Sequence, residues 1–155
     1  MIPERKLENN LSKTRLRLWL KLLKASSLIE DEIRRRLRTD CDWTLPRFDV
    51  MSALARYPDG LKMSEISTLL RVSNGNITGI VDKLANEGLA LRVAVPGDRR
   101  ANLVRLTPKG QVVFAEHAAA HEAWIDDMLS GLNGDDIDGM SVRLDHLTQS
   151  LEERA

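Results

Sequence analysis

Residues 61–88 read LKMSEISTLLRVSNGNITGIVDKLANEG, and this stretch decides the fold. It contains two helical patterns, residues 63–70 and 74–86, joined by a tight turn at residues 71–73. Ser73 is a favourable N-cap for the second helix, because its hydroxyl can accept a hydrogen bond from a backbone N–H of the first turn. Gly88 lies where that helix is expected to end. The apolar residues expected to face inward are Ile66, Leu69, Leu70, Ile77, Ile80, Val81 and Leu84.

Beyond Gly88 the pattern changes from helical to alternating. Residues 91–95 (LRVAV) alternate larger apolar side chains with arginine and alanine, which predicts a strand. Residues 96–100 (PGDRR) read as a turn-rich tip, and residues 102–106 as the returning strand. Two short helices followed by a hairpin are the order of a winged helix-turn-helix. We therefore predict this fold for residues 61–107.

Further helices are predicted on both sides of this unit. Residues 45–57 have a helical pattern that opens with Thr44 as N-cap and Pro46 in the first turn. Residues 11–38 form a long helical pattern with more apolar surface than one buried stripe requires, and residues 108–129 form another. A last helix carries apolar residues at the spacing of a coiled-coil seam: Ile137, Met140, Leu144, Leu147 and Leu151.

Together these patterns predict a mainly α chain with a small β-hairpin. We expect a single domain over residues 1–155. Its winged helix-turn-helix lobe covers residues 45–107, and residues 11–38 and 108–153 supply a helical dimerisation lobe. The wide apolar surface of the first helix and the seam of the last both need a partner, which favours a homodimer.

The outward face of the helix at residues 74–86 has the chemistry of a DNA-reading surface. Asparagine can pair with adenine in the major groove, and threonine can contact a thymine methyl group. Gly75 and Gly79 share a face and permit close approach of a backbone, while the N–H groups at the helix start suit a phosphate. A polar, solvated surface is the plain alternative. The DNA-binding residues predicted on this helix are Ser73, Asn74, Gly75, Asn76, Thr78 and Lys83.

The hairpin tip adds a basic element to this surface. Asp98, Arg99 and Arg100 complete the predicted DNA-binding set. Arginine at a loop tip can enter a narrow minor groove, where the negative potential is enhanced. Asp98 can orient one of the arginines through a charge-assisted hydrogen bond. The alternative interpretation of these three residues is an exposed turn with a weak ion pair.

The net charge of the chain is zero, but the charges are segregated. Residues 1–40 carry a net charge of +5 and residues 92–109 a net charge of +4, whereas residues 110–155 carry −8. A basic surface can face phosphate while an acidic one faces away from it. The distribution therefore agrees with DNA binding although the sum does not suggest it.

The chain resembles the MarR family of multiple antibiotic resistance regulators. The resemblance extends over nearly the whole chain and is most specific in the wing. It implies a homodimer that binds a pseudo-palindromic operator on double-stranded DNA, and a small-molecule effector that usually releases it. It also implies that Arg100, in the family's Asp-x-Arg pattern with Asp98, enters the minor groove. The matching segments are LPRFDVM (45–51), KMSEI (62–66), VSNGNITGIVDKL (72–84) and GDRRANLVRLTPKG (97–110).

The resemblance also implies an effector pocket between the two lobes. Residues 120–129 (AHEAWIDDML) are similar to family members connected with the breakdown of aromatic acids and their coenzyme A thioesters. This similarity suggests an aromatic acid or its thioester as effector, with phosphates meeting Arg34, Arg35, Arg36 or Arg38. The same arginines also suit a solvated face or a contact with DNA phosphate. Apolar walls with a few polar groups suit such a ligand, although the same residues also suit a plain core. The expected pocket residues are Trp19, Leu23, Phe48, Met51, His117 and Trp124.

Two further groups of side chains have chemistry that could sense a metal ion or an oxidant. His117 and His121 share a helix face beside Glu116 and have the spacing of zinc ligands, but the sequence does not assemble further ligands, and no metal site or cofactor is predicted. Cys41 is the one cysteine, and the acidic neighbours Asp40 and Asp42 disfavour its thiolate. A zinc-sensing regulator and a ligand-independent architectural DNA binder remain the alternatives.

Other classes of protein are disfavoured. The chain has no Gly-rich phosphate loop, nucleophile elbow or metalloprotease motif, so an enzyme is not expected. It has no apolar run long enough to span a bilayer and no apolar signal-peptide core. With a single cysteine it fits a reducing compartment. We expect a cytoplasmic protein that does not enter membranes. A winged helix that binds protein instead of DNA is a further alternative.

Overall fold

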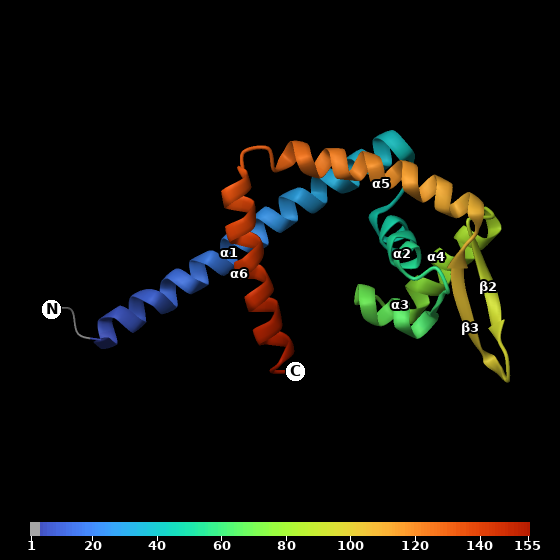
Figure 1. The fold of residues 1–155 in the computed structure, drawn as a ribbon, viewed down its shortest axis with the longest axis horizontal. Coiled ribbons are helices and arrows are strands. Elements are labelled where there is room, and N and C mark those ends of the chain that lie inside the picture. Colours follow the sequence, from blue (N-terminus) through green and yellow to red (C-terminus); the bar gives the residue numbers. More distant parts are fainter. Residues whose placement is uncertain (1–3) are drawn as a thin grey trace. The chain divides into compact units, whose positions relative to one another are not determined.

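The computed structural model describes the backbone of residues 4–155 and the side chains of residues 10–98 and 102–155. Helices dominate, together with one small antiparallel sheet (Figure 1). The elements in chain order are α1 (Glu4–Arg36), η1 (Leu37–Cys41), α2 (Leu45–Arg56), β1 (Leu61–Lys62), α3 (Met63–Leu70), α4 (Asn74–Asn86), β2 (Ala90–Val95), β3 (Asp98–Leu106), α5 (Pro108–Met128) and α6 (Gly134–Glu152).

The mainly α fold with a winged helix-turn-helix is confirmed. The chain divides into two compact units, residues 1–121 and residues 122–155. In the first unit, α2, α3, α4 and the sheet enclose the core. Its fully buried side chains include Leu37, Val50, Met51, Leu54, Ile66, Ile77, Val81, Leu84 and Val104.

One predicted core position in the helix-turn-helix is wrong. Leu69 is 49% exposed and lines a surface groove with Tyr57 and Leu61. The helix α3 has only eight residues, and Ile66 is the one residue of this helix that is fully buried. Ile80 and Leu70 are half-buried instead of fully enclosed. The helical spacing of apolar residues predicted correctly which side of each helix faces the core. A short helix, however, buries fewer of these residues than its pattern suggests.

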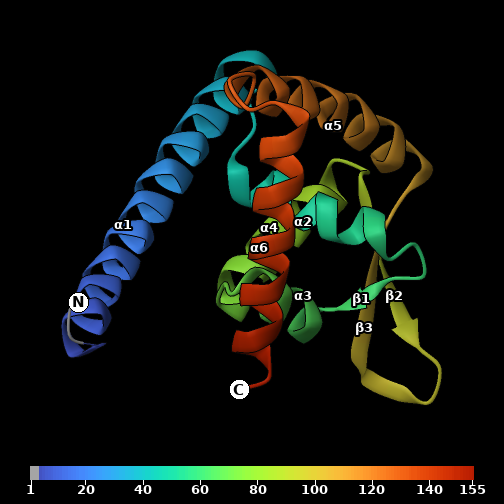
Figure 2. The same ribbon diagram turned by 60° about the vertical axis from the view of Figure 1, so that its left-hand side comes forward.

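The sheet has one more strand than the predicted hairpin. Its order is β1-β3-β2, with every pair antiparallel (Figure 2). The two-residue strand β1 pairs Leu61 with Val104, and it follows Gly60, whose φ of 107° bends the chain into that position. A strand this short has no period to detect. The tip is also tighter than predicted, because Pro96 and Gly97 alone connect Val95 to Asp98.

Helix caps confirm the predicted starts of α2 and α4. The Thr44 hydroxyl accepts a hydrogen bond from the Arg47 N–H, and the Ser73 hydroxyl accepts one from the Asn76 N–H. The segment between the predicted helices at residues 11–38 and 45–57 is partly helical. Residues 37–41 continue α1 as a π-helical turn, which ends at Asp42 in the left-handed conformation with φ of 55°. The burial of Leu37 keeps this turn wound against the core.

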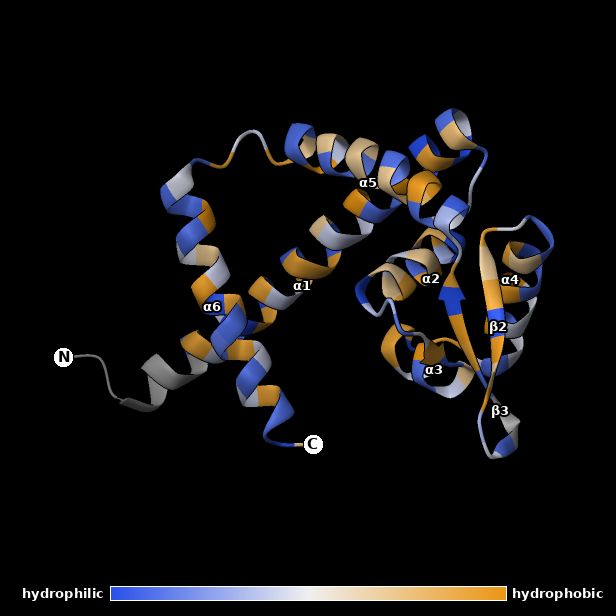
Figure 3. Cartoon of the chain, turned by 45° about the vertical axis from the view of Figure 1, so that its right-hand side comes forward, coloured by the Kyte–Doolittle hydropathy of each residue, from blue (hydrophilic) through white to orange (hydrophobic). Residues whose placement is uncertain are grey.

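Apolar residues recur along α1 and α6 (Figure 3). Many of their side chains are exposed. On α1, Leu16, Leu18, Trp19 and Leu20 are each more than half exposed. On α6, the five seam residues are 45–53% exposed, and none of the helix is buried within its own unit. No helix among the described residues combines the length and the apolar content needed to cross a membrane.

Candidate DNA-binding face

The helix α4 is held by a hydrogen-bonded turn at its N-terminus. Arg71 ends α3 in the left-handed conformation with φ of 54°, which turns the chain toward α4. The Ser67 hydroxyl on α3 lies 2.5 Å from Oδ1 of Asn74 and donates to it across the turn. This hydrogen bond joins the two helices across the turn. We call α4 the reading helix, and its first turn is therefore joined to α3.

The predicted residues on α4 lie together on its exposed side. Ile77, Val81 and Leu84 point into the core, so the intervening residues face outward. Ser73, Asn74, Gly75, Asn76, Thr78 and Lys83 are all exposed. A Cβ placed on Gly75 or Gly79 would meet nothing within 4 Å. Protein packing thus gives no reason for the two glycines, which leave the helix backbone open to a partner.

The exposed residues are not equally available to DNA. Asn74 uses its amide oxygen on Ser67, and the Thr78 hydroxyl donates to the Asn74 carbonyl oxygen at 2.9 Å. The side-chain amide of Asn76 makes no hydrogen bond to the described part of the chain. This amide can therefore present both a donor and an acceptor to a base edge. Position alone did not separate the roles of these two asparagines.

A groove of about 440 Å³ runs beside this face. It brings the loop before α2 next to the reading helix, which the sequence pattern did not show. Arg47 and Thr44 line this groove and were not among the predicted DNA-binding residues. The groove is lined by Asp42, Thr44, Arg47, Gly75, Asn76, Gly79, Ile80 and Lys83.

The wing contacts α4 through charge. Arg92 on β2 forms an ion pair with Asp82 on the exposed side of α4. Asp98 is exposed at the start of β3. The side chains of Arg99 and Arg100 lie outside the described residues, so their predicted entry into a minor groove stays a prediction.

The C-terminal end of α4 is surrounded by cations. Glu87, its C-cap residue, pairs with Arg47 of α2, and the hydrogen bond from Arg47 is the largest cause of the lowered pKa of Glu87. Lys83 and Lys109 lower that pKa further through their charges. Lys109 also donates to the Glu87 carbonyl oxygen at 3.2 Å. Glu87 therefore links the end of α4 to α2 through its carboxylate and to α5 through its backbone carbonyl oxygen.

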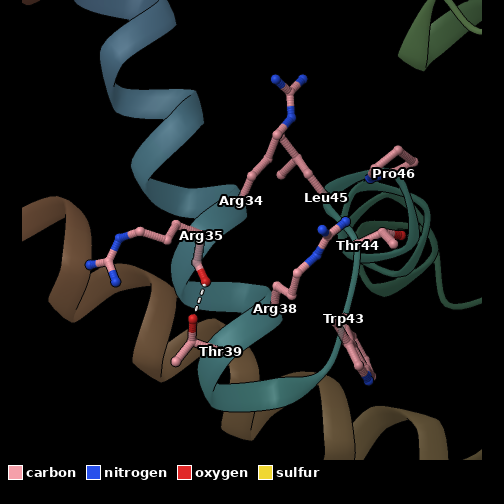
Figure 4. Close-up of a pocket in the computed structure, with 8 residues that line it drawn as sticks. All are labelled: Arg34, Arg35, Arg38, Thr39, Trp43, Thr44, Leu45 and Pro46. Carbon is pink, nitrogen blue, oxygen red and sulfur yellow. Dashed lines mark hydrogen bonds between the residues drawn. The ribbon is translucent and has the colours of Figure 1, made fainter.

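A second pocket, of about 570 Å³, lies between the end of α1 and the start of α2. Figure 4 shows Arg38 extending toward Thr44 and Leu45, while Arg35 points away from them. Arg34 and Arg35 pair with acidic neighbours on α1, but none of these ion pairs includes Arg38. The pocket is lined by Arg34, Arg35, Arg38, Thr39, Trp43, Thr44, Leu45 and Pro46.

The six residues expected to bind an effector are dispersed. None of them lines the pocket of Figure 4. Phe48 and Met51 are buried on α2 and Trp124 is buried on α5, whereas Trp19 and Leu23 are exposed on α1. His117 packs edge-on against Trp43, with ring centroids 4.0 Å apart. Trp43, which the structure places at the pocket and against His117, was missed because one aromatic residue in a loop has no periodic signal.

The histidines on α5 belong to an aromatic cluster. His121 stacks on Phe48 at 4.8 Å between centroids, and burial lowers the pKa of both His117 and His121. Among the side chains that the structure describes, no three His, Cys, Asp or Glu residues are grouped to hold a metal ion. Burial, with the charge of Asp40, raises the pKa of the Cys41 thiol.

A short helix-turn-helix with an exposed polar second helix, flanked by a hairpin, defines a winged helix-turn-helix protein of the nucleic-acid-binding class. Residues 43–101 match the MarR family model. The chain is 28% identical over 123 residues to the HTH-type transcriptional regulator MhqR of Bacillus subtilis, covering 79% of this chain and 83% of MhqR. In sequence and in fold, the chain is therefore similar to MarR-family transcriptional regulators.

Solved structures agree with this assignment. A MarR-family regulator from Silicibacter pomeroyi superposes with a TM-score of 0.74 at 29% identity, covering 90% of this chain and 96% of that one. FabT of Streptococcus pneumoniae, solved in complex with DNA, superposes with a TM-score of 0.73 at 24% identity, covering 91% and 99%. The second similarity shows a shared fold.

Proposed function

We propose that this protein is a DNA-binding transcription regulator of the MarR family, acting as a homodimer on a pseudo-palindromic operator. The exposed polar face of α4, open at Gly75 and Gly79, carries this proposal. The Asn76 amide reads a base edge in the major groove, and Lys83 lies near a phosphate. Arg100 at the wing tip enters the minor groove. Such a protein acts on chromosomal DNA in the cytoplasm.

The test of DNA reading begins with duplexes selected by the purified protein from a random library. We expect one discrete palindrome, with two half-sites roughly 34 Å apart, one DNA turn. Arg100→Ala should cost about 1–3 kcal/mol in binding to that duplex, the scale of one groove contact. Uniform coverage without a preferred sequence would favour an architectural role. Binding that does not weaken with salt would favour a protein partner, because phosphate contacts impose a salt dependence.

The homodimer is proposed from the exposed apolar residues of α1 and α6. Five seam residues on α6, each nearly half exposed, form a stripe that a second copy of the chain would cover. Leu147→Glu should give a monomer in light scattering and abolish cooperative binding to the palindrome. Arg143→Glu, on the same helix but outside the seam, is the matched control. A dimer that survives Leu147→Glu would exclude this seam.

The proposed effector is an aromatic acid or its coenzyme A thioester. The pocket of Figure 4 offers a guanidinium at Arg38 and an aromatic wall at Trp43, a combination that suits an anion with a flat apolar part. We expect benzoyl, coumaroyl or feruloyl thioesters, or the free acids, to bind in calorimetric titrations. Arg38→Met should weaken that binding, while Arg56→Met on α2 should not. No binding below millimolar concentration would reject this effector class.

A further inference from the structure

Arg47 occupies an unusual place at the start of α2. Its side chain is 16% exposed, and its guanidinium carbon lies 4.5 Å from the centroid of the Trp43 ring. The same guanidinium pairs with Glu87 at the C-terminus of α4, forty residues further along the chain. One side chain thus links the loop before α2 to the end of the reading helix.

Stability alone is a poor reason for this arrangement. A cation in the first turn of a helix faces the positive end of the helix dipole. The Arg47 Nε is buried and makes no hydrogen bond to the described residues. Its partner Glu87 is 48% exposed. Ion pairs of this kind often contribute little to the free energy of unfolding, because solvent weakens the attraction and the buried partner must be desolvated. Such pairs can instead select one geometry among several of similar energy.

The geometry in question is the orientation of α4, which is held at both of its ends. At the N-terminus, Asn74 and Ser67 fix α4 to α3. At the C-terminus, the Glu87 carboxylate forms an ion pair with Arg47 of α2. The Glu87 carbonyl oxygen accepts a hydrogen bond from Lys109 at the start of α5. Loss of the Arg47 link would leave this end held from the α5 side. A small rotation of α4 would then displace Asn76 from a base edge, since base contacts require hydrogen-bond geometry.

We propose that Arg47 is a positioning residue: acting through Glu87, it sets the orientation of α4 on DNA. This inference rests on the proposed DNA-binding function and concerns the same face. In this proposal, Glu87 connects Arg47 to α4. The Trp43 ring packs against the Arg47 guanidinium and holds it toward α4.

The experiment compares the affinity for the selected duplex with that for a scrambled duplex of equal composition. The variants are Arg47→Met, Glu87→Gln and the double substitution, with Arg56→Met as control for lost charge on the same helix. Each single variant should lower the ratio of the two affinities about tenfold, and the double variant should lower it no further, because coupled residues are not additive. Arg47→Lys should retain most of the ratio, since its charge still reaches Glu87.

Salt dependence separates positioning from direct phosphate contact. Loss of a phosphate contact lowers the slope of log K against log salt by about one, and we expect no such change for Arg47→Met. A lowered slope with an unchanged affinity ratio would overturn the proposal, as would additive losses or no loss. Melting curves identify any variant that does not fold, in which case Glu87→Gln decides. A wild-type chain that selects no sequence would overturn the proposed function as well.

Discussion

Arg92 on β2 forms an ion pair with Asp82 on the exposed side of α4. The pair is partly exposed, and exposed pairs contribute at most about 1 kcal/mol to stability. Its larger effect is on charge, because an unpaired carboxylate on this face would repel phosphate. The wing therefore neutralises the one acidic side chain that α4 directs outward between Asn74 and Asn86.

From this pair we predict that Arg92→Ala weakens operator binding with little change in melting temperature. The double variant Asp82→Asn with Arg92→Ala should bind more tightly than Arg92→Ala alone, because it removes the exposed carboxylate. Fluorescence anisotropy with the selected duplex measures both. If the double variant binds no better than the single one, Arg92 acts by contacting DNA directly.

The two asparagines of α4 should respond differently to substitution. Asn74→Ala removes the bond to Ser67 and should lower the free energy of unfolding by about 0.5–1.5 kcal/mol. Asn76→Ala should leave stability unchanged and reduce discrimination at one base pair by about 1–3 kcal/mol. Denaturant titration and binding to single-base variants of the duplex separate the effects. Equal loss of specific and non-specific binding would assign Asn76 to a phosphate.

Two glycines give opposite expectations for stability. A Cβ on Gly110 would overlap the carbonyl of Leu89, so Gly110→Ala should destabilise the junction of the sheet and α5 by about 1–3 kcal/mol. Gly79→Ala adds a methyl group in open space and should stabilise α4 by about 0.5–1 kcal/mol. The same substitution should weaken operator binding, because the methyl group occupies the face that approaches DNA. Thermal denaturation and anisotropy measure both quantities.

The stability of the aromatic cluster should depend on pH. Burial lowers the pKa of His117 and His121, so the folded state favours their neutral forms. The unfolded chain takes up these protons first as pH falls below about 6.5. The stabilisation is therefore present above that pH and is lost as pH falls toward the lowered values. The melting temperature should fall less between pH 7 and 5.5 in His117→Phe/His121→Phe than in wild type, with exposed His146→Phe as control.

Much of the exposed face of α4 could be predicted from the sequence, because the helices and caps that form it depend on residues close together in the chain. The helices at residues 63–70 and 74–86 follow from the spacing of apolar residues, and the Ser73 cap follows from one hydroxyl beside its own helix. The pattern also places Asn76 and Lys83 on the outward side. By contrast, the strand β1 and the exposure of Leu69 depend on how far neighbouring elements extend over the core.

The links around α4 could not be predicted, because each joins residues distant in sequence. Arg47 and Glu87 are forty residues apart, and nothing in the pattern of either helix indicates that their side chains meet. The contact between Trp43 and His117 joins a loop to α5 in the same way. An arginine in the first turn of a helix, opposed by the helix dipole, was the one available signal that Arg47 has a distant partner.

The sequence by itself determined which side of α4 faces outward, since a period of 3.6 residues assigns each side chain to a face of the helix. Tertiary structure decided which of those outward groups can act. It engages Asn74 with Ser67 and leaves the Asn76 amide without a bond to the described residues, and it pairs Asp82 with Arg92. Periodicity is a property of one element, whereas hydrogen bonds and ion pairs depend on the positions of two.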